Sequence, residues 1–71
     1  MDEVRLSEVI RLEETERNFE GAIALLTGII QKDPTCIEAY IHLAADSGIL
    51  KRYRQAEHYA RAALRLDPKS G

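Results

Sequence analysis

Residues 19–34, FEGAIALLTGIIQKDP, decide the fold of this chain, because a related stretch, YRQAEHYARAALRLDP, recurs at residues 53–68. The prolines that close the two stretches, Pro34 and Pro68, are 34 residues apart. The same offset pairs residues of similar class along much of the chain: Phe19 with Tyr53, Ala22 with Ala56, Ile30 with Leu64, and, further upstream, Leu6 with Tyr40, Val9 with Leu43 and Ile10 with Ala44. A fixed period of this length indicates a stacked-repeat architecture. Such repeats present surfaces to binding partners instead of building a catalytic pocket.

Length and composition indicate one small domain that spans residues 1–71. Of the 71 residues, 45% are hydrophobic and 31% charged, as in a helical globular chain and unlike a disordered one. The net charge of −2 gives no general attraction to nucleic acid or anionic lipid. The charge is unevenly divided, since residues 1–36 carry eight acidic and four basic side chains and residues 37–71 carry four acidic and six basic ones.

The sequence predicts neither a membrane span nor a secretory signal. It has no apolar run of about 18 residues, the length that a transmembrane helix needs. The first residues lack the apolar core of a signal peptide. Cys36 is the only cysteine, so an intrachain disulfide is excluded. These features favour a cytoplasmic location.

Helical spacing of the apolar residues predicts four helices and an all-α fold. A first helix carries Leu6, Val9 and Ile10 and ends in the charged run at residues 15–17. A second helix begins after Asn18, which is a favourable N-cap residue. No segment alternates between apolar and polar residues over a useful length, which argues against strands.

Prolines and a capping motif mark the remaining boundaries. Pro34 and Pro68 disfavour helical geometry in the residue before them, so the second and fourth helices end there. Thr35 and Glu38 form a T-x-x-E capping box that predicts the start of the third helix, which breaks near residues 48–51. The core faces of the last two helices are predicted as Tyr40, Leu43, Ala44 and Ser47, and as Tyr53, Ala56, Ala60, Ala63 and Leu64.

The repeat resembles the tetratricopeptide family, whose pattern combines aromatic, Leu, small, Ala and Pro positions. The second copy, residues 37–70, matches at Tyr40, Leu43, Ala44, Tyr53, Ala56, Ala60, Ala63 and Pro68. The first copy, residues 3–36, matches more loosely at Leu6, Val9, Ile10, Phe19, Ala22, Leu26, Ile29 and Pro34. Ile10 replaces a small residue of the family, and Glu13 replaces an apolar one. The resemblance covers nearly the whole chain and implies two helix-turn-helix hairpins, stacked as a short right-handed superhelical array.

The repeated small and aromatic residues are interpreted as core. Ala22 and Ala56 are predicted to lie where the two helices of a hairpin cross, because a larger side chain would push the backbones apart. Phe19 and Tyr53 begin the second helix of each hairpin and are predicted to fill the space near the turn. These residues define a scaffold and do not name its target.

Candidate catalytic groups are few, and the sequence predicts no enzyme, no metal and no cofactor. Cys36, His42 and His58 lack the spacing of metal ligands, and both histidines are predicted to be solvated. No serine has the G-x-S-x-G context of a nucleophile. The glutamates of the first helix are interpreted as surface charge, and nothing in the sequence indicates a buried carboxylate pair.

Basic residues gather on the second repeat at Lys51, Arg52, Arg54, Arg61 and Arg65. Nucleic-acid binding would require exposed aromatic side chains among them, and Tyr53 is assigned to the core. A solvated helical face is therefore favoured over nucleic-acid binding.

The resemblance implies a groove along the first helix of each repeat, which holds an extended peptide or a partner helix. By position, the groove residues are Ser7, Arg11 and Glu14 in repeat one and Ile41, Ala45 and Ile49 in repeat two. Ile41 and Ile49 lie off the core face, so they indicate either an apolar groove floor or contact with another repeat or subunit. The Lys and Asn residues with which some family members clamp a C-terminal carboxylate are absent, because Ser7, Arg11 and His42 occupy those positions.

The fourth helix carries a second apolar stripe, formed by Tyr59, Ala63 and Leu66. Stable arrays generally need three or more repeats and a polar cap at each end. The stripe is therefore predicted to contact a further repeat of a longer protein or another copy of the chain. The predicted function is a non-enzymatic module or scaffold that binds a protein partner. The alternative is a self-assembly element or a fragment of a longer array.

Overall fold

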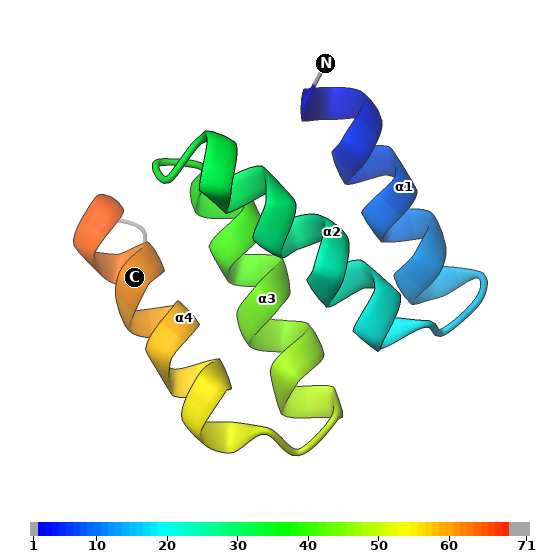
Figure 1. Cartoon of the computed structure of the whole chain (residues 1–71). Helices are drawn as coiled ribbons and strands as arrows, with labels where there is room; N and C mark the ends of the chain where they lie inside the picture. The colour runs from blue at the N-terminus through cyan, green and yellow to red at the C-terminus, as the bar shows by residue number, and fades with distance from the viewer. Residues whose placement is uncertain (1, 69–71) are drawn as a thin grey trace.

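The computed structural model describes residues 2–68, with side chains from residue 7 onward, and consists of four helices in this range. They are α1 (Asp2–Glu14), α2 (Phe19–Lys32), α3 (Ile37–Ile49) and α4 (Tyr53–Leu66), joined by short turns (Figure 1). No strand occurs in the described part of the chain, and the all-α prediction is confirmed. The side chain of Leu6, expected in the core, lies outside the described residues.

The helices pack against one another in chain order. Contacts join α1 to α2, α2 to α3 and α3 to α4. The result is an open row in which α1 and α4 lie at opposite ends (Figure 1). Its principal extents are 31 × 30 × 19 Å.

The 34-residue period extends to the backbone. The bounds of α2 and α4, Phe19–Lys32 and Tyr53–Leu66, are offset by 34 residues at both ends. The turns inside the two hairpins contain the two non-glycine residues of the described chain with positive φ, Arg17 at 50° and Lys51 at 63°, which have the same offset. Each hairpin turn thus has one residue in the left-handed region at the same repeat position, although the hydrogen bonds that close the two turns differ.

The turn after α3 has a hydrogen-bond pattern that explains the conformation of Lys51. The Lys51 N–H donates to the Gly48 carbonyl at 3.0 Å, and the Arg52 N–H donates to the Ser47 carbonyl at 2.8 Å. This pair of bonds is the Schellman arrangement. The C-cap is Leu50, and the residue that follows it, which is usually glycine in this motif, is Lys51. Lysine at this position costs about 1–2 kcal/mol of left-handed strain.

The predicted N-cap of α2 is confirmed. Asn18 Oδ1 accepts a hydrogen bond from the Gly21 N–H at 3.0 Å. A Cβ at Gly21 would lie 2.5 Å from the Asn18 side-chain nitrogen, so a larger residue there would force the capping side chain to shift. Gly28, in contrast, has open space where a Cβ would be.

The predicted capping box of α3 is wrong. The Thr35 hydroxyl donates to Asp33 Oδ1 at 2.7 Å, and the Thr35 N–H donates to the same atom at 3.1 Å. The N-cap of α3 is Cys36, which makes no side-chain capping bond. The Thr35 hydroxyl bonds to Asp33 because the two residues are only two positions apart. The predicted capping bond would instead have joined Thr35 to a backbone group three positions away.

A small apolar core runs through the first three helices and consists of Val9, Ala22, Leu26, Ile29, Ala39 and Leu43. Ala22 is fully buried, as predicted for a helix crossing, whereas Ala56 is half-buried. On α3 the buried face is formed by Ala39, Leu43, Asp46 and Ser47, while the predicted core residues Tyr40 and Ala44 are partly exposed. The helix is therefore rotated slightly from the expected orientation.

The two apolar stripes of α4 have the opposite roles to those predicted. Tyr53 and Leu64, expected in the core, are 67% and 49% exposed. Tyr59 packs against Tyr40 with ring centroids 6.4 Å apart, and Ala63 is buried. Tyr59 and Ala63 thus pack within the second hairpin. The burial of Ala63 agrees with its prediction as a core residue, whereas the packing of both residues is contrary to the prediction that they await an external contact. Leu66 remains 38% exposed.

Candidate functional site

An open groove of about 530 Å³ lies between the end of α1, the start of α2 and the second half of α3. It is lined by Glu13, Glu14, Arg17, Phe19, His42, Ala45, Asp46 and Ile49. Three of the predicted groove residues, Glu14, Ala45 and Ile49, are among them. The other three, Ser7, Arg11 and Ile41, are exposed but do not line it.

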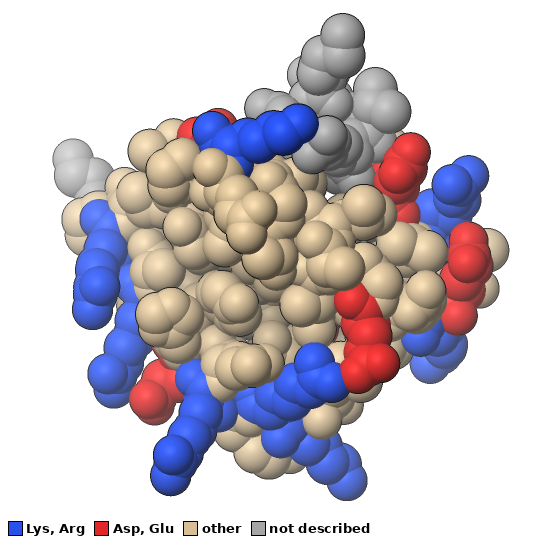
Figure 2. All heavy atoms as spheres, in the orientation of Figure 1, with Lys and Arg blue, Asp and Glu red and all other residues tan. Residues whose placement is uncertain are grey.

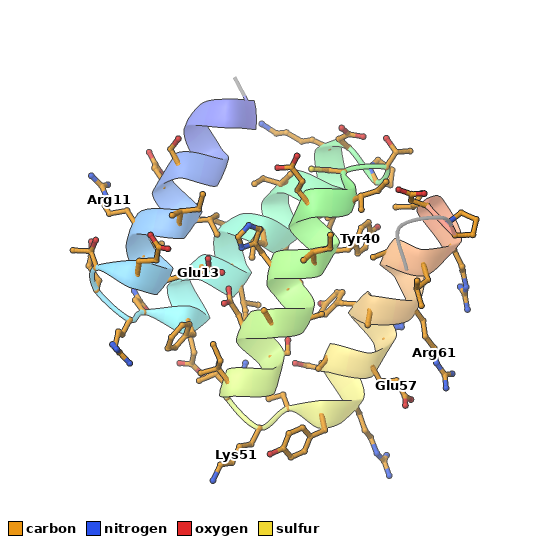
Figure 3. All side chains as sticks on the ribbon, turned by 180° about the vertical axis from the view of Figure 1, so that it is seen from behind. Arg11, Glu13, Tyr40, Lys51, Glu57 and Arg61 are labelled. Carbon is orange, nitrogen blue, oxygen red and sulfur yellow. The ribbon has the colours of Figure 1, made fainter. Side chains whose placement is uncertain are left out.

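The hairpin fold produces this groove. In a row of helices that alternate in direction, α1 and α3 both run the same way, so their C-terminal halves approach on one side of α2. Figure 3 shows this side, with the Glu13 side chain extending from α1 toward α3. The turn at residues 15–18 then brings Phe19 to the end of the groove.

One wall of the groove is apolar and open to solvent. Phe19, Ala45 and Ile49 form it, and the Ile49 side chain is 55% exposed. Ile41, two turns before Ile49 on α3, is 51% exposed. The exposure of both isoleucines agrees with the prediction that the repeat core does not cover them.

The same groove also carries an acidic cluster that joins α1 to α3. Nδ1 of His42 lies 3.0 Å from Oε1 and 3.3 Å from Oε2 of Glu13. The Glu13 side chain is 12% exposed and the His42 side chain 30%. The prediction that His42 is a solvated surface residue is wrong, because it is half-buried and bonded to a carboxylate 29 positions away.

Asp46, one turn after His42 on α3, is the most buried charged residue of the cluster, at 2% exposure. Burial, followed by the hydrogen bonding and negative charge of Glu13, raises the pKa of Asp46 from 3.8 to about 8, against the opposing influence of His42. Near neutral pH this carboxyl therefore holds a proton. Its Oδ2 atom is buried without a hydrogen-bond partner in the described part of the chain.

The buried carboxyl pair was missed in the sequence, although two signals pointed to it. His42 and Asp46 have i, i+4 spacing, which places them on one face of α3. Glu13 occupies an apolar position of the repeat pattern, which places it against the neighbouring helix. Neither signal reveals by itself that the two faces meet.

The groove has limited chemical capability. Its described lining contains carboxyls and an imidazole but no serine, threonine, cysteine or lysine that could serve as a nucleophile. Within the described residues, no three His, Cys, Asp or Glu side chains are placed to hold a metal ion. His58 is exposed, and Cys36 is a half-buried free thiol.

A second surface, on the α2 and α4 side, is notable for its lack of charge. Between Glu20 in its first turn and Lys32 at its end, α2 carries no charged side chain. Figure 2 shows a broad uncharged area over the middle of the molecule, bordered below and to one side by Lys and Arg. Tyr53, Leu64 and Leu66 are exposed on α4.

Nucleic-acid binding was disfavoured because Tyr53 was predicted to lie in the core, and the exposure of Tyr53 contradicts that prediction. The basic residues around it are nevertheless partly neutralised. Arg52 is paired with Glu20 across the hairpins, and Arg61 lies 3.6 Å from Glu57 on α4.

No helix in the described residues has the length and apolar character needed to cross a membrane. No protein-family model matches the sequence, and no curated protein or solved structure matches the chain significantly.

Proposed function

We propose that this chain is a two-repeat, tetratricopeptide-like module that binds a partner peptide or helix and catalyses no reaction. The support for the repeat type is the 34-residue period, present both in the residue pattern and in the bounds of α2 and α4. Arrays of this kind act by binding along the surface that their stacked helices create.

The observation that carries the proposal is the groove beside α1 and α3. It combines an exposed apolar wall at Phe19, Ala45 and Ile49 with charged residues at its rim. Apolar contact area with a few placed polar groups is the usual composition of a binding site. Leaving Ile41 and Ile49 in water forgoes about 1.5–3 kcal/mol of burial for each side chain.

A display experiment tests the groove. Random peptides on phage would be selected on the wild-type chain, and the enriched peptides would be measured against the double variant Ile41→Lys/Ile49→Lys. We expect this variant to lose binding while its far-ultraviolet circular dichroism stays helical. The matched control, Gln31→Lys/Gln55→Lys, adds the same charge at exposed positions outside the groove lining and should bind normally. Peptides that bind the double variant as well as the wild type would contradict the proposal.

A second candidate function is self-assembly, favoured by the uncharged surface over α2 and the exposed apolar residues of α4. In the first repeat, the residue equivalent to Leu64 is Ile30, which is half-buried beside the core. A second copy or a further repeat that covered Tyr53 and Leu64 would bury Leu64 as Ile30 is partly buried in the first repeat.

Sedimentation over a wide concentration range distinguishes the two functions. Self-assembly predicts a mass that rises with concentration in the wild type and stays monomeric in Tyr53→Ser/Leu64→Ser. Peptide binding in the groove predicts that the same double variant still binds the selected peptides. A wild-type chain that stays monomeric throughout excludes self-assembly and leaves the groove proposal intact.

A further inference from the structure

We infer that the groove recognises a basic partner, whose guanidinium or ammonium group binds between the carboxyls of Glu13 and Asp46. This inference rests on the proposed function, since it names the chemistry of the peptide that the same groove would bind. It concerns the acidic cluster, whereas the proposed function rests on the apolar wall.

The first support is a buried acceptor that the protein leaves unused. Asp46 lines the groove at 2% exposure, and its Oδ2 atom has no hydrogen-bond partner among the described residues. Buried polar atoms are almost always satisfied, so an unpaired one requires an explanation, such as a bound water, an ion or a ligand group. In its ionised form this carboxyl accepts hydrogen bonds only, so the partner that would satisfy ionised Asp46 is a donor.

His42 does not supply that donor. Its Nδ1 atom is directed at Glu13 and lies within 3.3 Å of both Glu13 oxygens. The histidine thus leaves Oδ2 of Asp46 unpaired. Glu13 and His42 are both partly exposed, so their side chains can shift to admit a ligand without disturbing the core.

The charges along the groove favour a cation. Once Asp46 is ionised, the groove is lined by the three carboxylates of Glu13, Glu14 and Asp46, against Arg17 and the imidazole of His42. A partner carboxylate would meet these carboxylates and be repelled. A guanidinium group, in contrast, offers several donors in a planar fork that matches carboxyl geometry.

The apolar wall suits the rest of a long basic side chain. Lysine and arginine carry an aliphatic stem that packs on apolar surface while the charged end reaches a polar group. Phe19, Ala45 and Ile49 line the same groove as the two carboxyls, so one side chain contacts both. The volume of about 530 Å³ leaves room for neighbouring partner residues.

Binding of a cation at Asp46 also predicts a release of protons. The pKa of Asp46 is about 8, so near neutral pH this carboxyl must lose its proton before it pairs with a cation. The other groups that face it are Glu13, Glu14, Arg17 and His42. Affinity should therefore increase as the pH rises toward about 8, by at most tenfold per pH unit.

The test uses the phage-displayed random peptides and a neutral analogue of arginine. Peptides selected on the wild type should be enriched in Arg or Lys at one position, and peptides selected on Asp46→Asn should not. In the best peptide, replacing that Arg with citrulline removes the charge and keeps the shape. Fluorescence anisotropy should show at least about a tenfold loss of affinity for the wild type. For Asp46→Asn the loss should be small, and the rise of affinity with pH should disappear.

The possible results separate the two proposals. Peptides that depend on Ile41 and Ile49 but show no basic preference, or citrulline peptides that bind as tightly as arginine peptides, overturn the basic partner and leave the groove function standing. A pH dependence that persists in Asp46→Asn also overturns the role of Asp46. Failure to select any peptide that depends on the groove overturns both proposals.

Discussion

Replacing Asp46 with Asn is expected to stabilise the protein at neutral and alkaline pH. In the folded chain this carboxyl is 2% exposed and next to Glu13, so ionising it places a second negative charge in a poorly solvated site. Asparagine has nearly the same shape and never ionises. The substitution therefore removes the unfavourable charge while keeping the packing of α1 against α3.

The magnitude follows from the pKa of Asp46, which rises from 3.8 to about 8 on folding. At about 1.4 kcal/mol per pH unit, this interval corresponds to on the order of 5 kcal/mol of folding free energy. Because the folded state holds the proton more tightly, the stabilisation is complete below pH 3.8 and is lost as the pH rises through about 8. A partly unpaired buried amide costs about 1–3 kcal/mol, so the expected net gain for Asp46→Asn near pH 8 is about 2–4 kcal/mol.

Urea unfolding followed by circular dichroism measures this effect. The free energy of unfolding would be determined for both proteins at several values between about pH 4 and pH 9, so that the difference isolates the titration of Asp46. At the acid end the variant should be less stable by about 1–3 kcal/mol, the cost of the buried amide, and the difference should turn in its favour as the pH rises. Glu38→Gln, an exposed glutamate of the same helix, serves as the control and should leave the pH dependence unchanged. A constant difference between wild type and Asp46→Asn across the whole range would refute the reasoning.

Three further comparisons test the helices and turns by thermal or urea unfolding. Gly28→Ala should raise the free energy of unfolding by about 0.5–1 kcal/mol, because a Cβ there has open space, whereas Gly21→Ala should give no gain because it collides with the α2 cap. Lys51→Gly should stabilise by about 0.5–1 kcal/mol by removing left-handed strain, and a loss of stability would mean that the turn is not strained. Ala22→Leu should destabilise by about 1–3 kcal/mol by overpacking a fully buried helix crossing, whereas the exposed Ala24→Leu should be nearly neutral. Equal effects of the two alanine substitutions would contradict the observed register of α2.

The features that the sequence predicted correctly are governed by short-range energetics. Asn18 caps α2 because its side chain reaches a backbone N–H only three residues away. Pro34 ends α2 through the steric limits of the residue before it. The 34-residue spacing of α2 and α4 appears in the sequence because an aromatic residue begins each helix and an Asp-Pro pair follows its end at that spacing. These constraints act within a few residues or repeat along the chain, so a linear pattern displays them.

Part of the groove was also accessible from the sequence. Ile41 and Ile49 stand out because they are apolar residues off the buried face of a helix, and helical spacing alone identifies that face. Glu14, Ala45 and Ile49, assigned to a groove by their position in the repeat, are among the residues that line the groove of the structure. Ser7, Arg11 and Ile41 do not line it, because the depth of a groove depends on how closely α1 approaches α3.

The rotation of α4 and the acidic cluster depend on tertiary contacts. The apolar residues of α4 form two adjacent stripes, and only the position of Tyr40 on α3 selects Tyr59 over Tyr53 as the buried aromatic. Glu13 and His42 are 29 residues apart, and no local pattern shows that their helix faces meet. The pKa of Asp46 depends on that meeting, because the desolvation and the neighbouring charge that raise it exist only once α1 and α3 lie together in the folded chain.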